Sequence, residues 1–189
     1  MSQDPEKLAG QLDKSTRTGG LPPLEKWHPE LSGDMDLRIT RDGTWLFKGS
    51  PIAREEIVRL FSTILRREED GEYYLVTPVE KWRIQVEDSP LLAHTMKVEN
   101  AGTEAQVVTL TTNMGETLEV GNEHPIEVGL YPGSEDPRPV VMVRHGVEAR
   151  LVTAAYYDLA EYIVECEIAG VPALGVMSHG ILYKIGDAG

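Results

Sequence analysis

Two stretches of the sequence share one order of predicted elements: a β-hairpin, an amphipathic helix and a second hairpin. In the first stretch, alternating apolar residues flank Asp42-Gly43, a dipeptide typical of tight hairpin turns. In the second, strand patterns flank His145-Gly146, and a helix pattern follows. The recurrence predicts an internal duplication. Because direct identity between the two stretches is weak, chance recurrence is the alternative.

The two helices are predicted from the spacing of apolar residues. In the first helix, expected over residues 53–67, these recur every three or four positions: Ile57, Leu60, Phe61, Ile64 and Leu65. Glu55 is placed to pair with Arg59 one turn later. The second helix is expected to start at Thr153 as its N-cap and to carry four periodic apolar residues: Tyr156, Leu159, Ala160 and Ile163.

The remaining sequence is predominantly β. Residues 73–87 predict a hairpin, and four short strands are expected between the two stretches, at 92–99, 105–112, 117–120 and 126–131. A final hairpin is expected around Ser178-His179-Gly180, a segment that lacks the spacing of a nucleophile elbow. The fold class is therefore α+β, with mainly antiparallel sheets and one helix in each half.

The predicted domains are an N-terminal arm over residues 1–26, a first repeat over 27–90 and a second, β-rich repeat over 91–186. Leu8 and Leu12 lie one helical turn apart, so the arm is expected to contain a short helix. Trp27 is expected to hold the arm against the body of the protein.

The charge of the chain excludes several partners. Lys and Arg number 18 against 31 Asp and Glu, a net charge of −13, so nucleic acid and anionic membrane surfaces repel the chain. No run of about 18 apolar residues predicts a membrane span. The first ten residues lack the apolar core of a signal peptide, and Cys166 is the one cysteine. These features predict a cytoplasmic protein.

Nine residues at predicted strand ends, turns and a helix start form the candidate ligand-binding set. Lys81 and the two arginines would meet an anionic group, Thr112 and Asn113 would offer neutral hydrogen bonds, and Trp82 would offer a stacking surface. Their alternatives are ordinary turns, core packing and, for Arg54, an internal ion pair. The set is Arg54, Thr77, Glu80, Lys81, Trp82, Asp88, Thr112, Asn113 and Arg144.

No standard catalytic or cofactor motif is present. The five histidines are widely spaced, so no zinc-ligand pattern occurs, and no phosphate-binding glycine loop is found. Cys166 lies between two glutamates, which disfavour a thiolate nucleophile. We therefore expect no metal, no cofactor and no catalytic residue.

Several segments resemble an uncharacterised bacterial family, domain of unknown function 1285. The matching runs are 36–39, 42–45, 49–54, 60–66, 75–81, 86–90, 112–113 and 143–149, within a span of about 27–186. The run Thr77-Pro78-Val79-Glu80-Lys81 is the most specific. The resemblance implies a duplicated α+β core, a C-terminal half loosely similar to pleckstrin-homology folds, and a ligand, nucleotide-based in character, held between the halves with a role in signal transduction.

Three functions follow as hypotheses. The first is a cytoplasmic ligand-binding or regulatory protein that takes a small, nucleotide-like molecule and is not an enzyme. The second is a hydrolase or transferase that uses Glu80, Glu87 or Asp88. The third is a protein-interaction scaffold that binds a partner along an exposed sheet edge.

Overall fold

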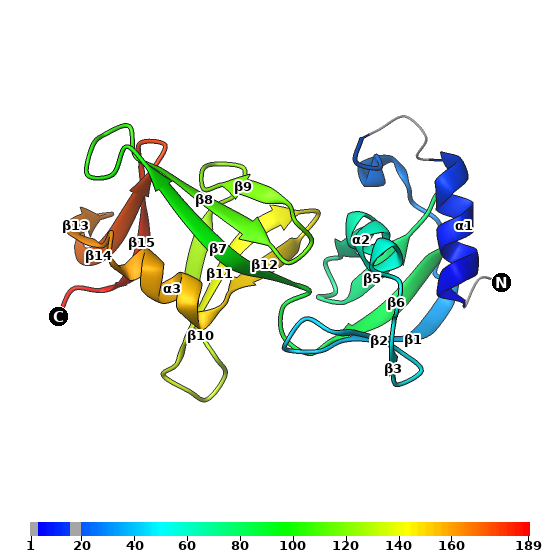
Figure 1. Cartoon of the computed structure of the whole chain (residues 1–189). Helices are drawn as coiled ribbons and strands as arrows, with labels where there is room; N and C mark the ends of the chain where they lie inside the picture. Colours follow the sequence, from blue (N-terminus) through cyan, green and yellow to red (C-terminus); the bar gives the residue numbers. More distant parts are fainter. Residues whose placement is uncertain (1–3, 16–19) are drawn as a thin grey trace. The chain divides into compact units, whose positions relative to one another are not determined.

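The computed structural model describes residues 4–15 and 20–189, and it divides into two compact units (Figure 1). One unit comprises Met1–Pro90 with His145–Val147, and the other comprises Leu91–Arg144 with Glu148–Gly189. Each combines helices with mainly antiparallel sheet, so the fold is α+β, as predicted. We refer to the units as the N-terminal and C-terminal domains.

The N-terminal domain is built on one six-stranded sheet. The strands lie in the order β3-β2-β1-β6-β5-β4, with β1 and β6 parallel and the other neighbouring pairs antiparallel. The elements are α1 (Pro5–Ser15), a 3-10 turn (Leu24–Lys26), β1 (Gly33–Ile39), β2 (Trp45–Phe47), β3 (Ser50–Pro51), α2 (Glu55–Thr63), β4 (Leu65–Arg67), β5 (Tyr73–Val76) and β6 (Lys81–Val86).

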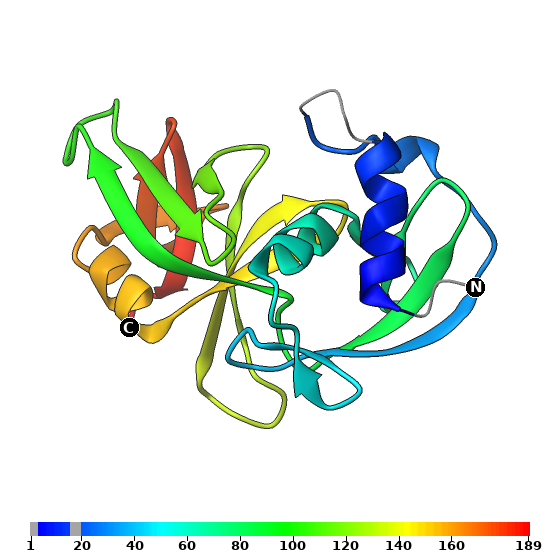
Figure 2. The same cartoon turned by 45° about the vertical axis from the view of Figure 1, so that its right-hand side comes forward.

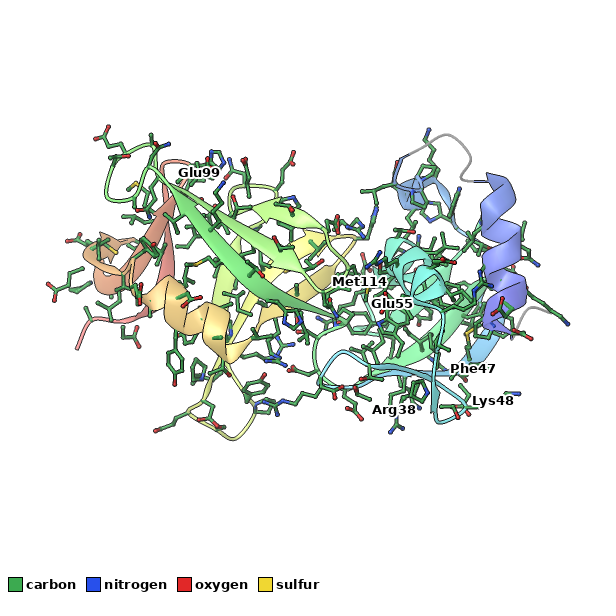
Figure 3. The ribbon with its side chains drawn as sticks, in the orientation of Figure 1. Arg38, Phe47, Lys48, Glu55, Glu99 and Met114 are labelled. Carbon is green, nitrogen blue, oxygen red and sulfur yellow. The ribbon has the colours of Figure 1, made fainter. Side chains whose placement is uncertain are left out.

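The hairpin predicted around Asp42-Gly43 is present and supplies one wall of this domain's core. Alternate residues of β1 are buried, which is the pattern of a strand with one covered face. Trp45 of β2 packs against Phe61 of α2 with ring centres 6.5 Å apart. Glu55, on the first turn of α2 (Figure 3), lies 3.9 Å from Arg59, and this confirms the predicted ion pair.

The N-terminal arm contains the helix predicted from its leucine spacing. Helix α1 packs against α2 (Figure 2). Its residues Leu8 and Leu12 are both completely buried. The anchoring role of Trp27 stays a prediction. Trp27 is half-buried, and Leu24 of the 3-10 turn, three residues before it, is fully buried.

The C-terminal domain has two sheets. A six-stranded sheet has the order β10-β11-β12-β7-β8-β9, with β12 parallel to β7, and a three-stranded antiparallel sheet has the order β13-β14-β15. The elements are β7 (Leu91–Glu99), β8 (Val107–Thr112), β9 (Thr117–Glu119), β10 (Ile126–Leu130), β11 (Pro137–Arg144), β12 (Val147–Leu151), α3 (Thr153–Ala160), β13 (Val164–Ile168), β14 (Val171–Ser178) and β15 (Ile181–Asp187).

Both predicted helices are shorter than the sequence pattern suggests. Helix α2 ends at Thr63, and Leu65–Arg67 form strand β4, because Leu65 pairs with Leu75 of β5. Helix α3 ends at Ala160, so Ile163 lies beyond it, and strand β13 follows, which the sequence did not predict. Thr153 is the first helical residue rather than the cap, which is Val152.

The order of elements supports the duplication read from the sequence. In each domain a set of strands precedes a helix, and three antiparallel strands follow it. In the N-terminal domain these three strands join the main sheet, whereas in the C-terminal domain they form their own. The likeness of the C-terminal half to pleckstrin-homology folds stays a prediction. No helix within the described residues is long and apolar enough to cross a bilayer.

Candidate functional site

The Thr77–Lys81 segment forms the tight turn between β5 and β6. Thr77 is buried, and its hydroxyl accepts hydrogen bonds from the backbone N–H of Glu80 at 2.9 Å and of Val79 at 3.3 Å. A threonine that bonds backbone groups two and three residues ahead fixes the turn. The most family-specific run of the sequence therefore has a structural role in this hairpin.

Lys81 belongs to an ion-pair network on the N-terminal sheet. Its ammonium donates to Glu68 at 2.8 Å and lies 4.7 Å from the centre of the Tyr74 ring. Arg66 donates to the other oxygen of Glu68 at 2.7 Å. Burial raises the pKa of Glu68, but the hydrogen bonds from Lys81 and Arg66 outweigh it, so this pKa lies below its ordinary value. Lys81 is thus held in an ion pair within the fold, where the one carboxylate of Glu68 serves two cations.

Arg66 also holds the chain that precedes the sheet. Its guanidinium donates to the backbone carbonyls of Leu24 at 3.1 Å and Trp27 at 2.9 Å. A planar guanidinium can serve several acceptors at once. Arg66 therefore links the 3-10 turn to strand β4, a role that the sequence pattern did not indicate.

The other three candidates of the N-terminal domain lie apart from this network. Arg54 caps the start of α2 and pairs with Glu6 of α1 at 2.8 Å and with Glu56 at 3.2 Å, which is the internal ion pair weighed as its alternative. The Trp82 side chain is fully buried and contributes to the core. Asp88 is half-buried in the turn between β6 and β7.

Thr112, Asn113 and Arg144 come together at the β8–β9 turn, where Figure 3 marks Met114. The Asn113 side-chain oxygen accepts from the backbone N–H of Leu92 at 3.1 Å, and the Thr112 hydroxyl accepts from that of Met114 at 3.2 Å. Arg144 donates to both oxygens of Glu116, at 2.6 and 2.5 Å. The hydrogen bonds of these three side chains therefore stay within the protein and hold the β8–β9 turn in place.

The structure thus brings together Thr77, Glu80 and Lys81 in the N-terminal domain and Thr112, Asn113 and Arg144 in the C-terminal domain. The other three candidates, Arg54, Trp82 and Asp88, belong to neither group. In both groups the basic side chain already contacts a carboxylate, Glu68 for Lys81 and Glu116 for Arg144. Sequence reasoning treated these cations as available for an anion because their acidic partners are distant in the chain. That the two groups share one ligand stays a prediction.

A pocket that the sequence did not predict lies in the C-terminal domain, between the β9–β10 turn and the β14–β15 turn. Its volume is about 550 Å³, within the range of about 300–1,000 Å³ of small-molecule sites. Its polar lining consists of two carboxylates, two imidazoles and one amide: Glu119, Glu123, His124, His179 and Asn122. Among the residues that the structure describes, no lysine or arginine lines it.

Buried hydrogen bonds hold the β14–β15 turn in place. Ser178 is fully buried, and its hydroxyl donates to the carbonyl of Val120 at 2.7 Å and accepts from the N–H of Val108 at 3.0 Å. The Gln106 side chain donates to the carbonyl of Met177 at 2.8 Å. These bonds join β14 to the main sheet, so this wall of the pocket is preformed.

The second wall is a closed turn over residues 121–124. The backbone N–H of Gly121 bonds the carbonyl of His124 at 3.3 Å, and the N–H of His124 bonds the carbonyl of Gly121 at 3.1 Å. Across the pocket, His179 occupies the left-handed region with φ of 50°, followed by Gly180 at 74°. Two consecutive residues with positive φ are typical of the tight turns that join adjacent strands.

Both imidazoles are oriented by acceptors. His124 Nδ1 lies 3.0 Å from the carbonyl of Met142, and His179 Nε2 lies 3.0 Å from Glu119. Because a carbonyl and a carboxylate only accept, these nitrogens are the donors. In the neutral rings, the second nitrogen of each is then an acceptor. The side chains that line the pocket therefore include carboxylates and imidazoles that can accept hydrogen bonds.

The sequence held only indirect signals of this pocket. The connection between the strands predicted at 117–120 and 126–131 and the hairpin turn predicted at Ser178-His179-Gly180 are more than fifty residues apart. Local patterns cannot show that two such turns meet. Among residues 4–15 and 20–189, no three or more His, Cys, Asp or Glu side chains are arranged to hold a metal ion.

Two family models match the chain over almost its whole length. Residues 22–89 match the N-terminal domain of a protein family of unknown function, DUF1285, and residues 90–185 match the C-terminal domain of the same family. No functionally curated protein is significantly similar to the chain.

Two solved structures are similar to the chain. A DUF1285 family protein from Silicibacter pomeroyi DSS-3 is 40% identical, with a TM-score of 0.80 over 93% of this chain and 94% of that one. A DUF1285 family protein from Shewanella baltica OS155 is 27% identical, with a TM-score of 0.52 over 67% of this chain and 91% of that one.

Proposed function

Because the chain belongs to the DUF1285 family, whose name carries no function, we propose a function from its own geometry: it binds a small organic cation in the C-terminal pocket. The observation that carries this proposal is the lining of the pocket, where two imidazoles are held by acceptors, two carboxylates are present and, among the described residues, no lysine or arginine is found. Such a surface complements a ligand that carries several N–H donors and a positive charge.

The charge of the surrounding sequence supports the same ligand class. Residues 101–189 contain 4 basic and 13 acidic residues, a net charge of −9. A negative domain raises the local concentration of cations around it. An ammonium or guanidinium group between Glu119 and Glu123 would replace part of its hydration with carboxylate contacts.

A nucleotide-like ligand, as the family resemblance implies, is the second candidate. In this pocket a phosphate would meet two carboxylates, and the basic residues first assigned to it, Lys81 and Arg144, are paired with Glu68 and Glu116. The small organic cation is therefore better supported as the ligand than the nucleotide. A regulatory role in cytoplasmic signal transduction remains part of the proposal, and a lone cysteine suits that reducing compartment.

Thermal denaturation of the full chain tests the proposal with two sets of compounds at millimolar concentration: linear polyamines and guanidinium compounds in one, nucleotides in the other. A ligand that binds the native state raises the melting temperature. We expect stabilisation by members of the first set. Stabilisation by nucleotides alone would reject the cation in favour of the second candidate, and no stabilisation by either set would reject both.

Matched variants connect binding to the pocket. Glu119→Gln with Glu123→Gln keeps the shape of the lining and removes both negative charges, so affinity for the cation is expected to fall about tenfold or more. Glu127→Gln changes an exposed glutamate on β10 outside the lining and serves as the control. Equal affinity in the pocket variant and the control would place the ligand elsewhere.

A further inference from the structure

Strand β13 (Val164–Ile168) is an open edge of the three-stranded sheet in the C-terminal domain. Within the described part of the chain, β14 is its one hydrogen-bonded neighbour, and Figure 1 shows it at the outer side of β14. All five of its residues are exposed or half-buried. An uncovered edge presents unpaired backbone N–H and C=O groups that can pair with another strand.

The two faces of β13 differ in chemistry. Because side chains alternate along a strand, Val164, Cys166 and Ile168 share one face, and Glu165 and Glu167 share the other. Val164 is 49% exposed. Val171 of β14, which pairs with Ile168, is 57% exposed and extends the apolar row.

The glutamates disfavour a second copy of this chain as the occupant. In an antiparallel pair of two β13 strands centred on Cys166, Glu165 of each copy would lie opposite Glu167 of the other. Like charges directly opposite each other destabilise a strand pair. The same positions favour lysine or arginine on an incoming strand, and the domain's negative charge would attract such a segment.

We propose that β13 is a docking edge that takes an extended basic segment of a partner protein as an added strand. The segment would alternate basic and apolar residues, so that its basic side chains meet Glu165 and Glu167 while its apolar ones cover Val164 and Ile168. Backbone hydrogen bonds would supply the affinity, and the alternation of basic and apolar side chains would supply the specificity. This surface is independent of the pocket proposed above.

A labelled peptide of alternating lysine and valine tests the proposal by fluorescence anisotropy with the full chain. We expect it to bind, with affinity that falls as salt increases, while a glutamate–valine peptide does not bind. Glu165→Lys with Glu167→Lys is expected to weaken the lysine peptide about tenfold and to permit binding of the glutamate peptide. The control, Glu104→Lys with Glu135→Lys, reverses two exposed loop charges. It should change the binding of neither the lysine peptide nor the glutamate peptide.

Alternate N-methylation of the peptide separates strand addition from simple charge attraction. Methyl groups on every second amide block one hydrogen-bonding edge of the peptide, and two such peptides exist, one for each edge. One of them should bind like the unmethylated peptide, and the other should lose binding. Equal binding of the two methylated peptides would refute strand addition. An equal loss of affinity for the lysine peptide in the β13 variant and in its loop control would refute it as well. Self-association of the wild-type chain through β13, detected by sedimentation and abolished by the β13 variant, would also overturn the proposal.

Discussion

The buried hydroxyl of Ser178 gives the most direct quantitative test of how the C-terminal domain is assembled. Ser178→Ala removes one acceptor and one donor at a fully buried position and changes the side-chain volume little. The carbonyl of Val120 loses the hydroxyl as a donor, and the N–H of Val108 loses it as an acceptor. A buried polar group left without its partner costs about 1–3 kcal/mol, and two groups are affected here, so we expect the free energy of unfolding to fall by about 2–6 kcal/mol.

Scanning calorimetry of the full chain measures this loss. For a domain of about 100 residues, 1 kcal/mol corresponds to about 4–8 °C, so the transition that contains the C-terminal domain should fall by at least about 8 °C. All three tryptophans, Trp27, Trp45 and Trp82, lie in the N-terminal domain, so their fluorescence reports separately on that domain. Hydrogen exchange should rise in β8 and β9.

The control variant is Ser134→Ala. The Ser134 hydroxyl accepts from the N–H of Asp136 at 3.0 Å in an exposed loop, where water can replace it. Its expected effect is below about 0.5 kcal/mol. If Ser178→Ala cost no more than this control, the bonds between β14 and the main sheet would be unimportant for stability, and the argument for a preformed pocket wall would fail.

Three further predictions concern the N-terminal domain. Glu68→Gln should lower the free energy of unfolding at pH 7, measured by urea unfolding. The difference from wild type should shrink as the pH falls below 4.5, the ordinary pKa of a glutamate carboxyl. The native pKa of Glu68 is lowered, so its carboxylate stabilises the fold above pH 4.5 and loses this contribution when it is protonated. Leu12→Ala should cost about 2–5 kcal/mol and increase proteolysis of α1, since its fully buried side chain packs in the interior; unchanged proteolysis would contradict this packing. Trp82→Ala should cost about 3–5 kcal/mol in the tryptophan-monitored transition, whereas a residue needed only for ligand stacking would leave that transition unchanged.

Local sequence patterns predicted most of the strands because the signals are local. The Asp42-Gly43 turn and the alternation of β1 depend on residues within a few positions of one another. The errors occur where distant residues decide the outcome. Leu65 continues the helical spacing of α2, yet its pairing with Leu75 places it in a strand. Strand β13 alternates glutamate with apolar residues, but its short length and exposed faces gave a weak signal.

The predicted site shows the same contrast between local signals, which the sequence carries, and contacts between distant residues, which it does not. The sequence singled out Lys81 and Arg144 as candidate cations for a ligand, but it could not show that Glu68 and Glu116 lie beside them. The pocket is the clearest case. Its two turns are recognisable separately, whereas their meeting depends on Ser178, whose buried bonds reach Val108 and Val120.

By itself, the sequence determined the α+β class, the order of most strands, the negative charge and the membership of a family that two solved structures represent. Each of these depends on composition or on patterns along the chain. Only the tertiary structure decided which charges neutralise one another, where the helices end and which turns enclose a pocket. These depend on distances between residues far apart in the chain, where burial and partner geometry determine whether a polar side chain stabilises the fold or faces a ligand.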